Sequence, residues 1–106
     1  MYTPWGKAQT IEQILPGVTA VSTASHGGIK LSKERFLQMP VEFQVYEPFT
    51  DQSSGHWYEE DQDALIPLAW FHPDENVRTQ CLRAIEQLSA YFGDAGTKAI
   101  QILFNI

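Results

Sequence analysis

The sequence predicts a single α+β domain in which a small antiparallel sheet of about three to four strands packs against about three to four helices. The length of 106 residues is near the commonest size of one domain, so residues 1–106 form one unit. β-branched runs alternate with stretches whose apolar residues recur every three or four positions. The hydrophobic content of 43% supplies enough apolar surface for a core and argues against a disordered chain.

The N-terminal part of the chain predicts one helix followed by a hairpin. Apolar residues at helical spacing predict a helix over residues 5–15, which a Pro-Gly pair ends. Residues 18–24 are rich in β-branched side chains, which favours a strand. Gly27 and Gly28 then supply the backbone freedom for a tight reversal into a second strand at 29–31.

The next segment predicts a short helix and a further strand. Ser32 is suited to cap a helix that ends before Pro40 and turns Phe36 and Leu37 inward. Residues 41–46 alternate between apolar and polar side chains, which is the period of a half-buried strand. A helix is the alternative for this stretch.

The C-terminal half predicts mostly helix. A polar loop at 50–55 leads to an acidic run at 59–61, which we expect in the first turn of a helix that Pro67 kinks or divides. An aspartate caps the longest helix, expected at about residues 74–92, with Gly93 placed to stop it. Its apolar stripe consists of Val77, Cys81, Ile85, Leu88 and Phe92. The apolar tail at 99–106 is β-prone and predicts a strand against the sheet.

Charge is distributed unevenly along the chain. Residues 36–77 contain no Lys or Arg, although nine of the 13 carboxylates lie there. These nine are Glu42, Glu47, Asp51, Glu59, Glu60, Asp61, Asp63, Asp74 and Glu75. Such a field repels phosphate backbones, so direct nucleic-acid binding is disfavoured and a basic protein surface or a cation is favoured. The alternative is that an acidic surface only keeps the protein in solution.

Cysteine content and hydropathy favour a reducing compartment. Cys81 is the one cysteine, which excludes an intrachain disulfide and is more typical of a small core residue than of a nucleophile. No stretch has the length of a membrane span, and the first ten residues lack the pattern of a secretory signal. We therefore expect a cytoplasmic location without membrane contact.

His26 is the first candidate for chemistry. It lies beside two glycines, where a ligand can approach the backbone closely, and an imidazole can act as acid or base. The alternative is an exposed histidine in a hairpin turn. Ser22 and Ser25 lie in no recognisable nucleophile motif, so no catalytic triad is predicted.

The acidic run is the second candidate. His56 and Glu59 or Glu60 would share one helical face, and Asp63 would add a carboxylate, so this set could hold a magnesium or manganese ion. Acids that open a helix already have an explanation in the helix dipole. We therefore expect neither a metal nor a cofactor.

Trp57 and Tyr58 directly precede these acids. Two large aromatics joined to a carboxylate run could anchor a protein partner by apolar contact and select it by charge. The predicted partner-binding residues are therefore Trp57, Tyr58, Glu59, Glu60, Asp61 and Asp63. The alternative is that the aromatics fill the core.

Three motifs together resemble a family of uncharacterised small domains encoded by phages, plasmids and other bacterial mobile elements. They are Trp5-Gly6, the run Ser25-His26-Gly27-Gly28-Ile29-Lys30-Leu31-Ser32, and Trp57-Tyr58-Glu59-Glu60-Asp61. The resemblance covers roughly residues 3–73. That family often has a cysteine after the acidic run, where this chain has Gln62, which argues against thiol chemistry there.

The resemblance implies a mobile-element origin and a bacterial host cell. Joined to the charge pattern, it favours a small acidic protein that binds a basic surface of a host protein complex. Such binding could block a nucleic-acid-targeting defence system, in the manner of an anti-CRISPR or anti-restriction protein. One alternative is a small enzyme or metal-dependent hydrolase that uses His26 with the carboxylates of residues 59–63, and another is a structural or regulatory module without chemistry. A homodimer formed through exposed apolar surface is also open.

Overall fold

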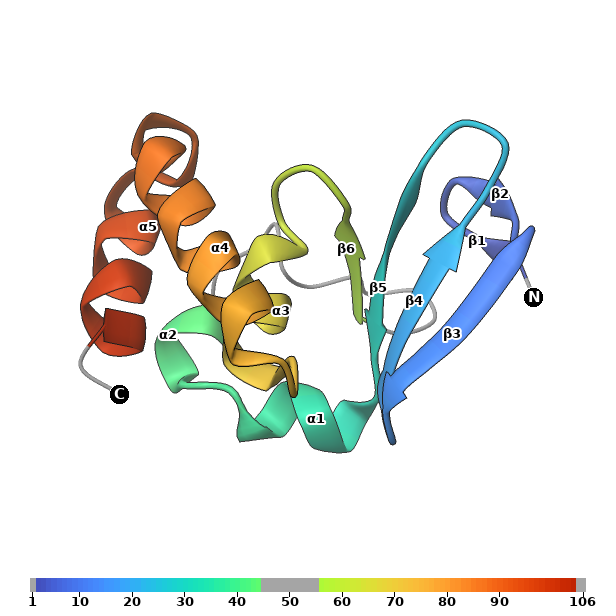
Figure 1. Cartoon of the computed structure of the whole chain (residues 1–106), viewed down its shortest axis with the longest axis horizontal. Helices are drawn as coiled ribbons and strands as arrows, with labels where there is room; N and C mark the ends of the chain where they lie inside the picture. Colours follow the sequence, from blue (N-terminus) through green and yellow to red (C-terminus); the bar gives the residue numbers. More distant parts are fainter. Residues whose placement is uncertain (1, 45–55, 105–106) are drawn as a thin grey trace.

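The computed structural model describes residues 2–44 and 56–104 and has an α+β architecture, as the sequence predicts. A four-stranded antiparallel sheet lies at one end of the molecule and the helices gather at the other (Figure 1). Its strand order is β3 (Thr10–Leu15), β4 (Val18–Ser22), β5 (Gly27–Leu31) and β6 (His56–Glu59). A separate two-stranded ribbon is formed by β1 (Tyr2–Thr3) and β2 (Gly6–Lys7).

The helix predicted at residues 5–15 is wrong, because this segment forms β2 and β3. Ile11 pairs with Val21 and Gln13 with Thr19, so the backbone groups of β3 bond across to β4 and not along a helix. Gly6 has a φ of +120°, which an α-helix does not allow. Ile11 is 53% exposed, so the helical spacing of apolar residues does not mark a buried face here.

The hairpin predicted after residue 18 is confirmed, but its turn lies elsewhere. β4 and β5 pair from Val18 with Leu31 to Ser22 with Gly27. The reversal is made by residues 23–26, where the Thr23 amide donates to the His26 carbonyl oxygen at 2.7 Å. Both glycines belong to β5. A Cβ at Gly28 would collide with the carbonyl oxygen of Tyr58 and with the Trp5 ring, so close packing explains this glycine.

The predicted short helix is confirmed as α1 (Lys33–Gln38), whose first turn is capped by the Ser32 hydroxyl. Phe36 faces inward as predicted, whereas Leu37 is 57% exposed. The strand predicted at 41–46 is wrong over its described part. Val41–Gln44 forms a helical turn, α2, in which Phe43 is buried and Val41 exposed, and residues 45–55, including the predicted loop, lie outside the described part.

Helices α3 (Leu65–Phe71) and α4 (Glu75–Gln87) follow the strand β6. Pro67 neither kinks nor divides α3, because it lies in the first turn, where no backbone donor is needed. The Asp74 side chain caps α4 by accepting from the Asn76 amide at 2.8 Å, as expected. The helix ends at Gln87, five residues before the expected end, because the backbone leaves helical geometry at Leu88.

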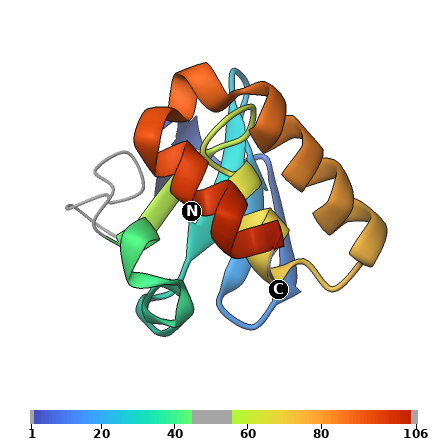
Figure 2. The ribbon, with the colours of Figure 1, turned by 90° about the vertical axis from the view of Figure 1, so that its left-hand side faces the viewer.

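The strand predicted for the tail is wrong over residues 99–104, because they belong to the helical α5 (Ser89–Phe104); residues 105 and 106 lie outside the described part. Gly93 interrupts it with φ of 61° and ψ of −143°. The helix packs against α4 and α2, on the far side of α3 and α4 from the sheet (Figures 1 and 2). A helix satisfies its own backbone groups, so the segment needs no sheet edge.

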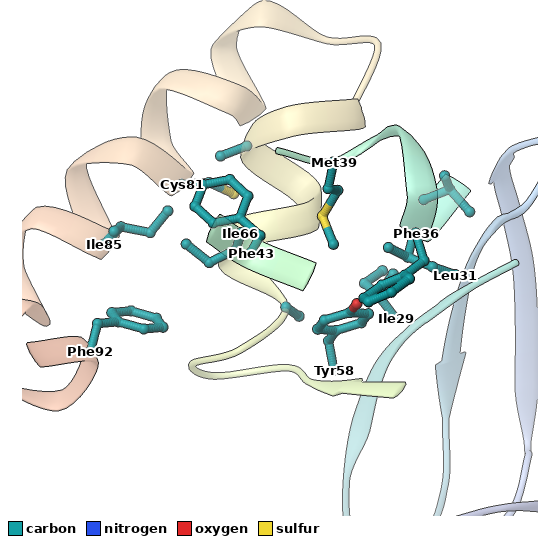
Figure 3. Close-up of a cluster of buried hydrophobic side chains, with 13 residues drawn as sticks. Ile29, Leu31, Phe36, Met39, Phe43, Tyr58, Ile66, Cys81, Ile85 and Phe92 are labelled. Atoms are coloured by element: carbon teal, nitrogen blue, oxygen red, sulfur yellow. The ribbon is translucent and has the colours of Figure 1, made fainter. Parts of the chain in front are cut away.

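The core lies between the inner face of the sheet and the helices (Figure 3). Ile29, Leu31 and Tyr58 project from β5 and β6 toward Phe36 and Met39. The predicted apolar stripe is confirmed, since its members at 81, 85 and 92 are buried and those at 77 and 88 pack against the cluster. Within the described part of the chain, no helix has both the length and the apolar character needed to cross a membrane.

Candidate functional site

The acidic run begins at Glu59, the last residue of β6, and continues into the turn that joins β6 to α3; we call residues 59–63 the acidic turn. The strand ends where the Glu60 amide donates to the Gly27 carbonyl oxygen at 3.0 Å. The chain then folds back, because the Ala64 amide donates to the Glu59 carbonyl oxygen at 2.9 Å. The acids were expected in the first turn of a helix. They instead precede α3, whose first turn contains no acid.

Three carboxylates of the acidic turn lie close together. One oxygen from each of Glu59, Glu60 and Asp61 falls within 4.8 Å of the other two. Glu60 and Asp61 are exposed and Glu59 is half-buried. Within residues 2–44 and 56–104, none of the three is held in an ion pair with a lysine or arginine. Like charges at this separation repel one another, so the turn favours binding of a cation or a basic side chain.

Asp63 is separate from this group because it is engaged by α5. The Tyr91 hydroxyl donates to its carboxylate oxygen at 2.9 Å. Burial raises the pKa of the Asp63 carboxyl above its usual range, and the hydrogen bond from Tyr91 lowers it in part. Tyr91 is 43% exposed, so it presents an aromatic ring at the edge of the acidic turn. No sequence signal joins these residues, which are 28 positions apart.

Trp57 and Tyr58 lie inside the protein, so the surface-anchor role predicted for them is wrong and the core alternative holds. They are 7% and 0% exposed. Tyr58 belongs to the main core, and burial, followed by the charge of Asp63, raises the pKa of its hydroxyl. Trp57 points to the opposite face of the sheet, where its ring meets Trp5 edge-on at 5.9 Å and the Lys30 ammonium at 5.1 Å.

The two histidines proposed for chemistry lie in different surroundings. His56 stacks on Phe36, with ring centroids 3.8 Å apart, on the inner face of the sheet. Among the described residues, neither His56 nor Asp63 joins the group of three carboxylates, so the metal set proposed from the sequence is not assembled. His26 is exposed and precedes Gly27, the residue that bonds to Glu60. The fold therefore brings His26 to the same end of the sheet as the acidic turn.

Two further side chains that could react, those of Cys81 and Ser22, have structural roles. Cys81 is buried in the helical part of the core, and burial raises the pKa of its thiol. A protonated, enclosed thiol is a poor nucleophile. The Ser22 hydroxyl is hydrogen-bonded to that of Thr10 on β3. Neither residue contributes to the acidic turn.

Comparison with known proteins identifies the family without naming an activity. The sequence profile of a family described as a domain of unknown function, DUF7007, matches residues 1–102, so the chain belongs to this family. No curated protein and no solved structure matches the chain.

Proposed function

We propose that this DUF7007 domain binds a basic surface of a partner protein through its acidic turn. The observation that carries the proposal is the convergence of the Glu59, Glu60 and Asp61 carboxylates without a basic partner among the described residues. An uncompensated acidic group gains most from a complementary positive surface, which speeds association and selects the partner.

Tyr91 supplies the apolar contact that Trp57 and Tyr58 do not. Its ring is partly exposed, and its hydroxyl is held by Asp63 at the edge of the acidic turn. A ring fixed in this way loses little side-chain entropy when a partner covers it. Aromatic residues at the centre of an interface commonly carry much of the binding energy. Tyr91 therefore replaces the two buried aromatics as the proposed anchor.

The finer proposal concerns the nature of the partner. Closely spaced carboxylates resemble successive phosphates in charge, so a protein groove that holds nucleic acid is a suitable target. With the resemblance to domains of phages and other mobile elements, this favours a bacterial defence complex as the partner. The domain would then act inside the host cell, by occupying the groove that the complex uses for DNA or RNA.

Affinity capture from a bacterial lysate tests this proposal. Wild-type protein should retain a partner that dissociates when salt is raised or when a DNA or RNA oligonucleotide is added. A variant with Glu59, Glu60 and Asp61 changed to Lys should retain none. The matched control reverses three exposed acids elsewhere, Glu34, Glu75 and Glu86, and should still capture the partner. Equal capture by both triple variants would reject the proposal.

A second candidate function is hydrolysis that uses His26 with the acidic turn. The backbone bond between Glu60 and Gly27 favours it, because it brings the neighbour of His26 beside the carboxylates. In that case His26→Ala should abolish a turnover reaction, and Glu60→Gln should do the same. Capture of a partner that is unaffected by His26→Ala would favour the binding function over this one.

A further inference from the structure

A small hollow adjoins the acidic turn between the sheet and the start of α3. It has a volume of about 170 Å³, and Glu60 is the one charged residue among those that line it. The other walls are apolar and come from β4, β5 and the start of α3, with Ala20, Ile29, Ala64 and Leu68 as the main side chains. The space is several times the roughly 30 Å³ that one water occupies in the liquid. It is therefore large enough for part of a side chain.

Small residues create this hollow. Ala20 pairs with Ile29 across β4 and β5, and Ala64 closes the turn before α3. Gly27, the first residue of β5, leaves room for the Glu60 side chain, since a Cβ there would lie 2.7 Å from a Glu60 carboxylate oxygen. The Glu60 amide is bonded to the carbonyl oxygen of the same glycine at 3.0 Å. The Glu60 carboxylate thus lies over Gly27 at the start of β5, at the rim of the hollow.

The apolar walls of the hollow and the Glu60 carboxylate at its rim together favour one kind of ligand. A neutral apolar group would take water from the Glu60 carboxylate without replacing its hydrogen bonds. An anion would meet Glu60 together with the carboxylates of Glu59 and Asp61. A cation on an aliphatic chain suits both the walls and the rim, because the aliphatic chain covers the apolar walls and the charge reaches the carboxylates.

We infer that the hollow receives an arginine side chain of the basic partner protein. The inference rests on the proposed function and names the contact by which the acidic turn would recognise that partner. Arginine is favoured over lysine because its planar guanidinium forms two parallel hydrogen bonds to one carboxylate and is weakly hydrated. The Glu60 carboxylate accepts these bonds, and the methylene groups pack against Ala20 and Leu68.

An NMR titration of the ¹⁵N-labelled protein tests the inference. The probe is a blocked peptide, Gly-Gly-Arg-Gly-Gly, and its partner probe carries citrulline, which keeps the shape of arginine without its charge. The arginine peptide should shift the amide signals of Gly27, Gly28, Glu60 and Ala64. The citrulline peptide should bind about tenfold more weakly or worse, as expected for loss of hydrogen bonds between charged groups.

Two variants separate the hollow from the general acidic charge. Glu60→Gln removes the charge at the rim, and Ala20→Leu fills the hollow without changing the charge. Each should weaken binding of the arginine peptide by about tenfold or more. Glu34→Gln is the control, since Glu34 is exposed and belongs to α1, which lies on the opposite side of the molecule from the turn between β6 and α3 (Figure 1). It should leave binding unchanged.

The outcomes distinguish this inference from the function on which it rests. Absence of binding, equal binding of the citrulline peptide, or full binding by Glu60→Gln would overturn the inference. If Ala20→Leu misfolds, the Glu60→Gln variant and the citrulline peptide still test whether an arginine side chain binds beside Glu60. A partner that depends on Glu59 and Asp61, yet is captured normally by Glu60→Gln, would retain the proposed function and reject the arginine site.

Discussion

Two consecutive pieces of the chain, β6 and the acidic turn, have opposite environments. Trp57 and Tyr58 are enclosed by side chains on the two faces of the sheet, whereas Glu60 and Asp61 face solvent. The change occurs where Glu60 makes the last backbone bond to β5. One continuous motif therefore has two roles: its aromatic residues stabilise the fold, and its exposed acids are available at the surface. Substitutions on either side of that point should have separable effects on folding and binding.

The largest expected effect is at Tyr58, the member of β6 with no exposed surface. Tyr58→Ala should lower the free energy of unfolding by about 3–5 kcal/mol, because it removes a large ring from the core and leaves a cavity. Urea unfolding followed by circular dichroism measures this change. A loss below about 1 kcal/mol would mean that the ring is not part of the core.

The next effect is at Gly28, which lies opposite Glu59 in the ladder. Gly28→Ala should cost about 1–3 kcal/mol of stability, because the added methyl group meets the Tyr58 carbonyl oxygen and the Trp5 ring. The carbonyl belongs to the backbone and cannot rotate away. Thermal unfolding of the variant provides the measurement. An unchanged or raised melting temperature would contradict the packing of Trp5 over β5.

The hydrogen bond between Tyr91 and Asp63 should make a smaller contribution to stability. Tyr91→Phe should cost about 0.5–1.5 kcal/mol at pH 7 and less at pH 3, because the lost hydroxyl donates to the ionised carboxylate. Urea unfolding at both pH values tests the difference. An equal cost at the two pH values would show that the bond does not depend on the charge of Asp63.

Asp63 also predicts the sign of a pH dependence. Burial raises the pKa of its carboxyl above the ordinary value of 3.8, so the folded state holds this proton more tightly than the unfolded chain does. The stability contributed by this group is therefore present at low pH and falls as the pH rises above the ordinary pKa of an aspartate, about 4. Asp63→Asn should flatten this part of the stability profile. The same slope in both proteins would contradict the assignment.

The smallest expected effect on stability comes from the acidic turn itself. Changing Glu59 and Glu60 to Gln and Asp61 to Asn should alter the free energy of unfolding by less than about 0.5 kcal/mol, or raise it slightly by removing repulsion. Partner capture by the same variant should be lost. A destabilisation of several kcal/mol would mean that these carboxylates stabilise the fold, as the side chains of β6 do, and would contradict their assignment to a solvent-exposed surface.

The sequence predicted correctly those features that depend on residues close together in the chain, namely helix caps and an apolar helical stripe. Ser32 and Asp74 cap helices at the expected positions, because a cap needs only a short side chain and the next few amides. The buried stripe of Cys81, Ile85 and Phe92 followed from helical spacing in the same way. Glu60 and Asp61 are exposed, whereas Glu59 is half-buried, and the helix expected to contain these acids begins later, at Leu65.

Contacts between distant segments account for the errors. Residues 10–15 have helical spacing of apolar side chains, yet β4 offers a pairing partner and the segment becomes β3. Trp57 resembled a surface anchor because nothing in the sequence shows that Trp5 and Lys30 cover it. Tyr91 could not be joined to Asp63, since only the packing of α5 beside the acidic turn brings them together.

We propose that the acidic turn is an open negative surface that binds a basic partner. Isothermal titration with a synthetic peptide of alternating arginine and glycine, at about 50 and 500 mM salt, tests it most directly. We expect binding to wild type that weakens about tenfold or more at high salt. The variant with Glu59 and Glu60 changed to Gln and Asp61 to Asn should bind weakly at both concentrations. Equal affinity and equal salt dependence in the two proteins would contradict the account.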